Sequence, residues 1–146
     1  MKILNRLSAI TILFALVSFK QPNTANKISV VINDLRNSKG KCIVYLYNNE
    51  NGFPSNPKKA LKTIASEISN GKAQVTFDNV VSGTYAISVL HDENSNGVMD
   101  KNFMGMPKEG YGVSNNNYYK LKAATFEESK FSINGNEKKI IINCHY

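Results

Sequence analysis

Residues 72–91 read KAQVTFDNVVSGTYAISVLH, and this stretch holds two runs in which apolar and polar residues alternate. The runs are Lys72–Asp78 and Thr84–His91, and Ser82-Gly83 lies between them. The residues that share one face are Ala73, Val75 and Phe77 in the first run and Tyr85, Ile87, Val89 and His91 in the second. Such alternation is typical of strands with one buried face, and Ser-Gly is typical of turns. The stretch therefore predicts two consecutive strands.

The same pattern recurs on both sides of this stretch. Further strands are predicted at Lys27–Asp34, Lys41–Tyr47, Ser129–Ile133 and Lys138–Tyr146. Their inward residues are Ile28, Val30 and Ile32 in the first, Cys42, Val44 and Leu46 in the second, and Ile140, Ile142 and Cys144 in the last. Asn70-Gly71 is a strong hairpin signal, and Asn134-Gly135-Asn136 marks another turn.

One segment, PSNPKKALKTIASEIS at 54–69, fits a helical period as well as a strand. We interpret it as a helical turn after Pro57 followed by a strand near Lys62–Ile68. The chain then has about seven strands with turns at short intervals, which predicts an all-β fold. We expect a single antiparallel β-sandwich, immunoglobulin-like or transthyretin-like, spanning 27–146, with one long ordered loop after His91.

The first residues have the pattern of a secretory signal peptide. Two basic residues precede Leu7–Phe19, an apolar run of 13 residues. A basic start followed by about 7–15 apolar residues directs export, and a spanning helix needs roughly 20. A buried N-terminal helix and a retained signal anchor are the alternatives. We expect residues 1–26 to be removed, with the cleavage site between 18 and 26. The mature chain is then periplasmic or secreted and has no membrane span.

The charge pattern argues against nucleic acid as a partner. The formal net charge is +7, from 18 basic and 11 acidic residues. Three of the basic residues precede residue 27, so the mature domain carries 15 basic and 11 acidic residues. Its lysines are scattered, whereas a nucleic-acid-binding surface needs a dense basic stripe with aromatic platforms. The pattern is that of a solvated surface.

Two cysteines, Cys42 and Cys144, lie near opposite ends of the mature domain. In an oxidising compartment an even number of cysteines favours a disulfide. Both fall on inward faces of predicted strands, so two buried free thiols are an equal alternative.

Two histidines, His91 and His145, are the candidate bases for catalysis. The local signatures Gly-x-Ser-x-Gly, His-Glu-x-x-His and Cys-x-x-Cys are absent from the sequence. His91 beside Asp92 leaves one enzymatic hypothesis open, a small hydrolase-like enzyme acting at that end of the sandwich. A histidine at a strand end more often bonds a loop, so we predict that the chain is not an enzyme.

The residues after His91 fit a calcium-binding loop over nine positions. In such loops positions 1, 3 and 5 offer side-chain oxygens, position 6 is Gly, position 7 offers a carbonyl, and position 9 often acts through water. The candidate ligands are Asp92, Asn94, Asn96, Val98 and Asp100, with Gly97 at the sharp turn. The pattern predicts Ca²⁺ as the cofactor of this loop.

The calcium pattern fails at position 12. Phe103 stands where a bidentate Glu is usual, and Glu109 is a candidate to supply the missing carboxylate. With so few carboxylates the dissociation constant should be about 10⁻⁴–10⁻³ M. The alternative is an Asn/Gly-rich turn whose side chains bond their own backbone.

Four aromatic residues follow in the long loop region, namely Phe103, Tyr111, Tyr118 and Tyr119. Exposed rings can stack on sugars or peptides. The other interpretation is that Phe103 and Tyr111 close one end of the sandwich and anchor the loop.

Long stretches of the chain resemble a secreted bacterial family. They are LRNSKGKCIVYLYNNENGFP (35–54), FDNVVSGTYAISVLHDENSNGVMDKNFMGMPKEGYGVSNN (77–116) and the closing IIINCHY (140–146). The central motif is His91-Asp92-x-Asn94-x-Asn96-Gly97, then Asp100, then Phe103-x-Gly105-x-Pro107-x-Glu109-Gly110-x-Gly112-x-Ser114-Asn115. On these residues the chain resembles the family catalogued as domain of unknown function 2141. Val80-x-x-Gly83-x-Tyr85 also resembles transthyretin-like and collagen-adhesin B-type sandwich domains.

The family resemblance implies an extracytoplasmic β-sandwich and brings no established activity. Cys42 and Cys144 depart from the family pattern, so a bridge would be a local feature of this chain. Together the observations predict an exported binding or structural module whose partner is a ligand of the cell envelope or the extracellular space.

Overall fold

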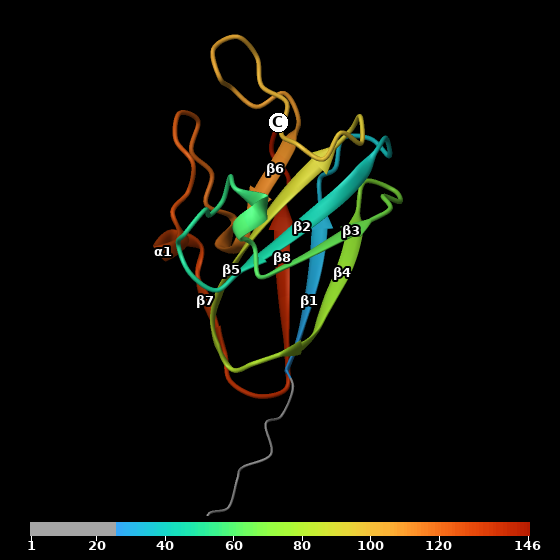
Figure 1. Ribbon diagram of the computed structural model, residues 1–146. Coiled ribbons are helices and arrows are strands. Elements are labelled where there is room, and N and C mark those ends of the chain that lie inside the picture. The colour runs from blue at the N-terminus through green and yellow to red at the C-terminus, as the bar shows by residue number, and fades with distance from the viewer. Residues whose placement is uncertain (1–25) are drawn as a thin grey trace, which may run out of the picture.

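The structure is a computed structural model that describes residues 26–146 (Figure 1). The predicted signal peptide, residues 1–26, lies outside the described residues apart from Asn26. The strands are β1 (Asn26–Asn33), β2 (Lys41–Tyr47), β3 (Lys62–Ser66), β4 (Ala73–Val80), β5 (Gly83–Asp92), β6 (Gly110–Val113), β7 (Phe131–Ile133) and β8 (Glu137–Asn143). The helical turns are η1 (Pro57–Lys59), η2 (Ser114–Asn116) and α1 (Phe126–Ser129). The ambiguous segment thus forms a helical turn and then a strand, as predicted.

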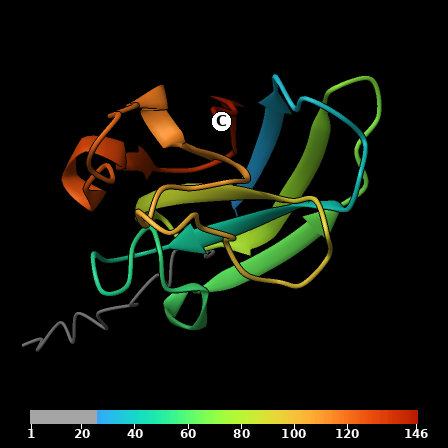
Figure 2. The same cartoon turned by 90° about the horizontal axis from the view of Figure 1, so that it is seen from above.

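The strands form two sheets, which confirms the predicted all-β sandwich (Figure 2). The three-stranded sheet has the order β4-β1-β8. In the five-stranded sheet the order is β3-β2-β5-β6, and β7 pairs with the first residues of β5. The finer likeness to transthyretin-like domains stays a prediction.

One pairing departs from the antiparallel arrangement that the sequence predicts. β1 and β8 run parallel, from Lys27 opposite Glu137 to Asn33 opposite Asn143. A tight turn forces neighbouring strands to be antiparallel, but the first and last strands have no such turn between them. Their direction is therefore set by the core that they share.

The tight turns join the two sheets rather than making hairpins within one sheet. At Asn70-Gly71 both residues have positive φ, and Ser69 and Lys72 exchange two backbone hydrogen bonds of 2.9 and 3.0 Å. Beyond that bridge β3 pairs with β2 whereas β4 pairs with β1. The predicted local turn is confirmed, but the expected hairpin is wrong because each strand finds its apolar partner in a different sheet.

The predicted inward faces form the core between the sheets. Ile28, Val30, Ile32, Cys42, Val44, Leu46, Phe77, Ile87 and Ile142 are among the buried residues of this cluster. Alternation alone therefore located the core correctly. A second buried cluster covers the opposite face of β2 and β5, with Tyr45, Tyr47 and Leu90 at its centre. Its partners Phe53 and Met99 come from connecting segments, and Phe126 is the first residue of α1.

Loops thus fold across the outer face of the five-stranded sheet, and β5 is buried on both faces. The long loop, residues 93–109, leaves from the end of β5 and projects beyond the sandwich (gold, Figure 1). Within residues 26–146 no helix has the length and apolar character needed to cross a membrane.

Candidate functional site

The base of the long loop is held by the buried carboxylate of Asp92. Its Oδ1 accepts a hydrogen bond from the backbone N–H of Asn96 (3.1 Å), and its Oδ2 accepts one from Gly97 (2.8 Å). Gly97 has φ +78, a conformation that favours glycine. A buried carboxylate needs hydrogen-bond donors, so these bonds fix the sharp turn that follows β5.

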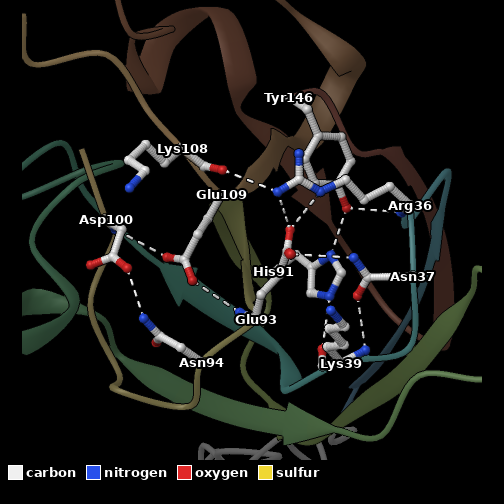
Figure 3. Close-up of polar contacts among 10 residues, drawn as sticks. All are labelled: Arg36, Asn37, Lys39, His91, Glu93, Asn94, Asp100, Lys108, Glu109 and Tyr146. Carbon is white, nitrogen blue, oxygen red and sulfur yellow. Dashed lines mark hydrogen bonds and ion pairs between the residues drawn. The ribbon is translucent and has the colours of Figure 1, made fainter. Parts of the chain in front are cut away.

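The other end of the loop is held by Glu109, which is also buried. Its Oε1 accepts the backbone N–H of Glu93 (2.9 Å) and its Oε2 accepts that of Asp100 (3.0 Å), as Figure 3 shows. Glu109 therefore folds back onto the loop, as the sequence suggested for a candidate ligand. In this arrangement it closes the loop by bonding backbone N–H groups at both sides.

The predicted metal ligands are brought together in one turn. The side-chain amides of Asn94 and Asn96 donate to Asp100, at 2.7 and 3.1 Å. Asn96 Oδ1 in turn accepts the backbone N–H of Val98 (2.9 Å). Among residues 26–146 no group of three or more His, Cys, Asp and Glu side chains is placed to hold a metal. The turn is satisfied by its own hydrogen bonds, and calcium stays a prediction.

His91 lies fully buried at the root of the loop. Its Nε2 lies 2.9 Å from the carbonyl oxygen of Lys39, and its Nδ1 lies 2.5 Å from the hydroxyl of Tyr146. Because a carbonyl only accepts, the ring donates from Nε2, and in the neutral ring Nδ1 accepts from the tyrosine hydroxyl. Both ring nitrogens are engaged, so the ring anchors the C-terminal residue and the 34–40 loop.

Arg36 extends this anchor to the long loop (Figure 3). Its guanidinium bonds Glu93 (2.7 Å) and the carbonyl of Lys108 (3.2 Å), and it lies 4.4 Å from the centre of the Tyr146 ring. Burial raises the pKa of Tyr146 to about 12. Burial alone would raise the pKa of Glu93, but hydrogen bonds from Asn37 and Arg36 and the Arg36 charge hold it below its ordinary value.

A groove of about 460 Å³ opens between the long loop and the outer face of the five-stranded sheet. Its floor includes Tyr45 and Leu90 from the central strands and Val113 from β6. The walls come from the long loop, from residues 117–124, and from Pro54, Ser55 and Pro57. A volume of this size suits a small organic ligand or a short chain, since such sites run from about 300 to 1,000 Å³.

The rim of the groove is apolar and basic. Val98 and Leu121 line it and are exposed, Leu121 to 88%. The charged side chains of the lining are Lys101, Lys120 and Lys122, and the lining contains no Asp or Glu.

One of these lysines has a carboxylate partner. Lys122 bonds Glu128 (3.3 Å) and lies 4.1 Å from the centre of the Tyr119 ring. Backbone and side-chain hydrogen bonds from Thr125, with a further one from Tyr119, lower the pKa of Glu128 to about 2. The segment that carries Lys120 and Leu121 is thus tied down at α1, whose first turn is closed by a capping box.

The aromatic residues of the long loop region differ in their burial and in their contacts. Phe103 is 97% exposed, so the expectation that it closes the end of the sandwich is wrong. Tyr111 is half-buried and lines the groove, while Tyr118 stacks on His145 at 4.3 Å between ring centres. His145 therefore packs against an aromatic ring. Sequence reasoning missed Leu121 and its neighbouring lysines, because their segment shows no periodic pattern.

Cys42 and Cys144 are free thiols in the buried core. Burial and the nearby Cys144 raise the pKa of Cys42 to about 12, and burial and Asp34 raise that of Cys144 to about 12. As long as the two thiols are unbridged, burial thus favours their protonated form, which is the less reactive one. A bridge stays a prediction, and alkylation of the unfolded, unreduced protein distinguishes two thiols from none.

Comparison with known proteins yields a family match. A family profile described as "Uncharacterized protein conserved in bacteria (DUF2141)" covers residues 30–141. Searches of the curated proteins and of the solved structures found no match. The matched region spans β1 to β8, includes the whole long loop, and agrees with the resemblance seen in the sequence. The chain belongs to this bacterial family of uncharacterised proteins, DUF2141.

Proposed function

We propose that this chain is a non-catalytic binding module that acts outside the cytoplasm. Its ligand enters the groove and is an elongated apolar molecule with an anionic group. The observation that carries the proposal is the rim, where exposed apolar side chains and unopposed lysines meet above an apolar floor. Contiguous exposed apolar surface marks a binding site in soluble proteins.

The position of the exposed apolar residues supports a site at the loops. The large exposed apolar side chains of the described chain are Leu61, Val81, Val98, Phe103, Met104, Tyr118, Leu121, Ile141 and Tyr146. Five of these nine lie on the long loop or on residues 117–124. A random surface would spread them over all elements.

The charge of the groove supports an anionic ligand group. Lys101 and Lys120 have no carboxylate within ion-pair distance among residues 26–146, whereas Lys122 shares Glu128. Two free ammonium groups beside an apolar floor favour a ligand with a carboxylate or phosphate at one end. Electrostatic complementarity of this kind contributes specificity.

The burial of His91 supports binding over the hydrolase alternative. The ring has both nitrogens engaged and does not line the groove. A general base must reach its substrate within about 2.6–3.2 Å. An enzyme at this end would require the C-terminal Tyr146 to leave first.

A calcium ion in the loop is a second part of the proposal. Its support is that Asn94, Asn96 and Asp100 meet at one point. Rotation of the two amides would turn their oxygens toward that point, in exchange for the hydrogen bonds that these oxygens accept from the N–H groups of Asn96 and Val98. Ca²⁺ takes six to eight oxygen ligands, so water would complete the shell. The ion would hold in place the loop that forms one wall of the groove.

A fluorescent anion tests the groove. Anilinonaphthalene sulfonate joins apolar rings to a negative group and brightens when it leaves water. We expect saturable binding, displaced by dodecanoate and not by dodecylamine, which has the same chain and the opposite charge. Ala123→Trp places a large ring in the groove lining and should weaken binding at least about tenfold.

The matched control is Thr84→Trp, at the exposed start of β5 and away from the groove. It should bind the dye like the unaltered chain. Equal dye binding by the unaltered chain, Ala123→Trp and Thr84→Trp, or no saturable binding, would show that the groove is not the binding site. Displacement by both surfactants would show that the groove does not select an anionic ligand.

Export is tested separately by mass spectrometry of the protein that cells accumulate, with an N-terminus expected between residues 18 and 28.

A further inference from the structure

The tip of the long loop, residues 101–108, presents apolar side chains to solvent. Phe103 is 97% exposed and Met104 is 72% exposed. The loop projects beyond the sandwich (Figure 1), and the side chains of Phe103 and Met104 are not part of the groove lining. Ordered apolar side chains that project in this way mark an interaction surface.

Four backbone N–H groups of the tip are already hydrogen-bonded within it. Asn102 Oδ1 accepts the N–H groups of Met104 (2.9 Å) and Met106 (3.0 Å). The N–H of Gly105 donates to the Asn102 carbonyl, and the N–H of Asn102 donates to the Met106 carbonyl, each at 2.9 Å. Backbone groups that are satisfied internally can leave water for an apolar medium at little cost.

Two lysines flank the apolar tip. Lys101 and Lys108 have no ion-pair partner among residues 26–146, and no Asp or Glu occurs between them. The nearest acids along the chain are Asp100 and Glu109, whose oxygens accept hydrogen bonds inside the loop. Apolar side chains between unopposed ammonium groups are complementary to an anionic lipid surface.

We propose that the tip docks onto an anionic lipid surface. Phe103 and Met104 enter the boundary between headgroups and acyl chains. Lys108 and Lys101, which also lines the groove, contact the phosphates. A protein partner fits the tip less well, because a stable interface needs about 800 Å² on each side and two projecting side chains offer far less.

Co-sedimentation with vesicles tests the docking. The protein is used in the form that cells accumulate, with phosphatidylcholine vesicles that contain or lack phosphatidylglycerol. We expect binding to the anionic vesicles, and weaker binding at higher salt. Phe103→Ser with Met104→Ser should lower the partition coefficient at least about tenfold, because each apolar side chain loses its transfer into the interface.

Matched variants separate the tip from general surface effects. Val81→Ser makes the same kind of change at the opposite end of β5, where Val81 is also exposed. Lys101→Gln with Lys108→Gln should remove most of the preference for anionic vesicles. The control is Lys138→Gln with Lys139→Gln, at the start of β8. This variant removes the same charge away from the tip and should keep most of the preference for anionic vesicles.

A single tryptophan reports the depth of the tip. The chain has no Trp, so Phe103→Trp provides one reporter at the proposed contact. Its emission should shift to the blue on anionic vesicles and be quenched by brominated acyl chains. Val81→Trp should do neither.

Three outcomes would overturn the proposal. One is the absence of vesicle binding. Another is binding that Phe103→Ser with Met104→Ser leaves unchanged. The last is self-association of the unaltered chain, without vesicle binding, that this double variant abolishes, which would assign the tip to a second copy of the protein.

Discussion

At the scale of single residues, the long loop depends on two buried carboxylates whose four oxygens accept backbone N–H groups. Asp92 fixes the start of the loop and Glu109 fixes its end. The sequence pattern singled out Asp92 as a calcium ligand, because the Asp-x-Asn-x-Asn-Gly run is local and its chemistry is carried by the residue types, and it offered Glu109 only as a candidate for the missing carboxylate. What it could not give is the role of Glu109, since the bonds to Glu93 and Asp100 join residues that are distant along the chain.

Glu109→Gln should destabilise the protein. The amide places a donor where Oε1 or Oε2 now accepts an N–H, and a buried group left without a partner costs about 1–3 kcal/mol. Urea denaturation measures the change in the free energy of unfolding. Glu127→Gln is the control, because this exposed side chain should cost less than about 0.5 kcal/mol. Equal midpoints for both variants would contradict the role given to Glu109.

The Arg36–Glu93 pair should make stability depend on pH. The pKa of Glu93 is lower in the folded chain than its ordinary value of 4.5. The folded state therefore binds a proton at Glu93 less readily than the unfolded state does. The ionised Glu93 carboxylate contributes stability above about pH 4.5, and this contribution is lost as the pH falls through the pKa of the folded state. The pair is partly exposed, so we expect about 1 kcal/mol or less.

The pH effect is measured as the difference in urea midpoint between the unaltered chain and Glu93→Gln. The difference should be present at neutral pH and should vanish in acid. A difference that grows on acidification would contradict the claim that the ionised Glu93 carboxylate stabilises the folded chain.

Calcium should raise the melting temperature if the loop binds it. At about 10 mM, on the order of ten times the expected dissociation constant, one site stabilises the fold by about 1.4 kcal/mol, which is a few degrees. Asp100→Asn removes a ligand charge and should abolish the shift. Asp78→Asn, an exposed acid on β4, should keep it. No shift in any of the proteins would leave the turn as one stabilised by its own hydrogen bonds.

At the scale of elements, alternation predicts which residues form strands and which face inward, as Val30, Val44 and Val75 demonstrate. It does not predict pairing. Asn70-Gly71 makes its turn, yet the strands on either side join different sheets, because register and partner depend on distant residues. The groove was missed for the same reason, since Leu90 and Leu121 are brought together only by the fold.

The short strand β6 is the element that joins the loop to both sheets. It pairs with β5, and Tyr111 exchanges two backbone bonds with His145. A Cβ at Gly112 would lie 2.7 Å from Ile142 Cγ2 and 2.9 Å from the carbonyl oxygen of Asn143. Only glycine lets the C-terminal segment approach β6 this closely.

Gly112→Ala should therefore push β6 away from the end of β8. Overpacking of this kind lowers the free energy of unfolding by about 1–3 kcal/mol. Ligand binding in the groove should weaken as well, because β6 forms part of its floor. Gly83→Ala is the control, because its Cβ would meet the Tyr85 ring at an ordinary 3.5 Å. Thermal unfolding of the two variants measures the difference. A Gly112→Ala protein that melts like Gly83→Ala would show that the close approach is dispensable.

At the scale of the whole molecule, a sandwich with a closed core carries its distinctive surface at one end. There the contacts among His91, Tyr146 and Arg36 hold the long loop and the C-terminal residue together (Figure 3). The long loop and residues 117–124 form walls of the groove, and the tip of the loop projects beyond the sandwich (Figure 1). The burial of His91 and the exposed apolar rim of the groove support the proposed binding module. The sequence predicted such a module in general terms, but the location of the groove required the assembled structure.

The most direct test of the binding role is to map dodecanoate onto the protein by NMR. Backbone amide shifts should change along the outer face of β5 and β6, on the long loop and at residues 117–124. Amides of β1, β4 and β8 should stay unchanged. Shifts centred on the His91 and Arg36 side of the loop, shifts spread over both sheets, or no shifts at millimolar dodecanoate would contradict the groove as the binding site.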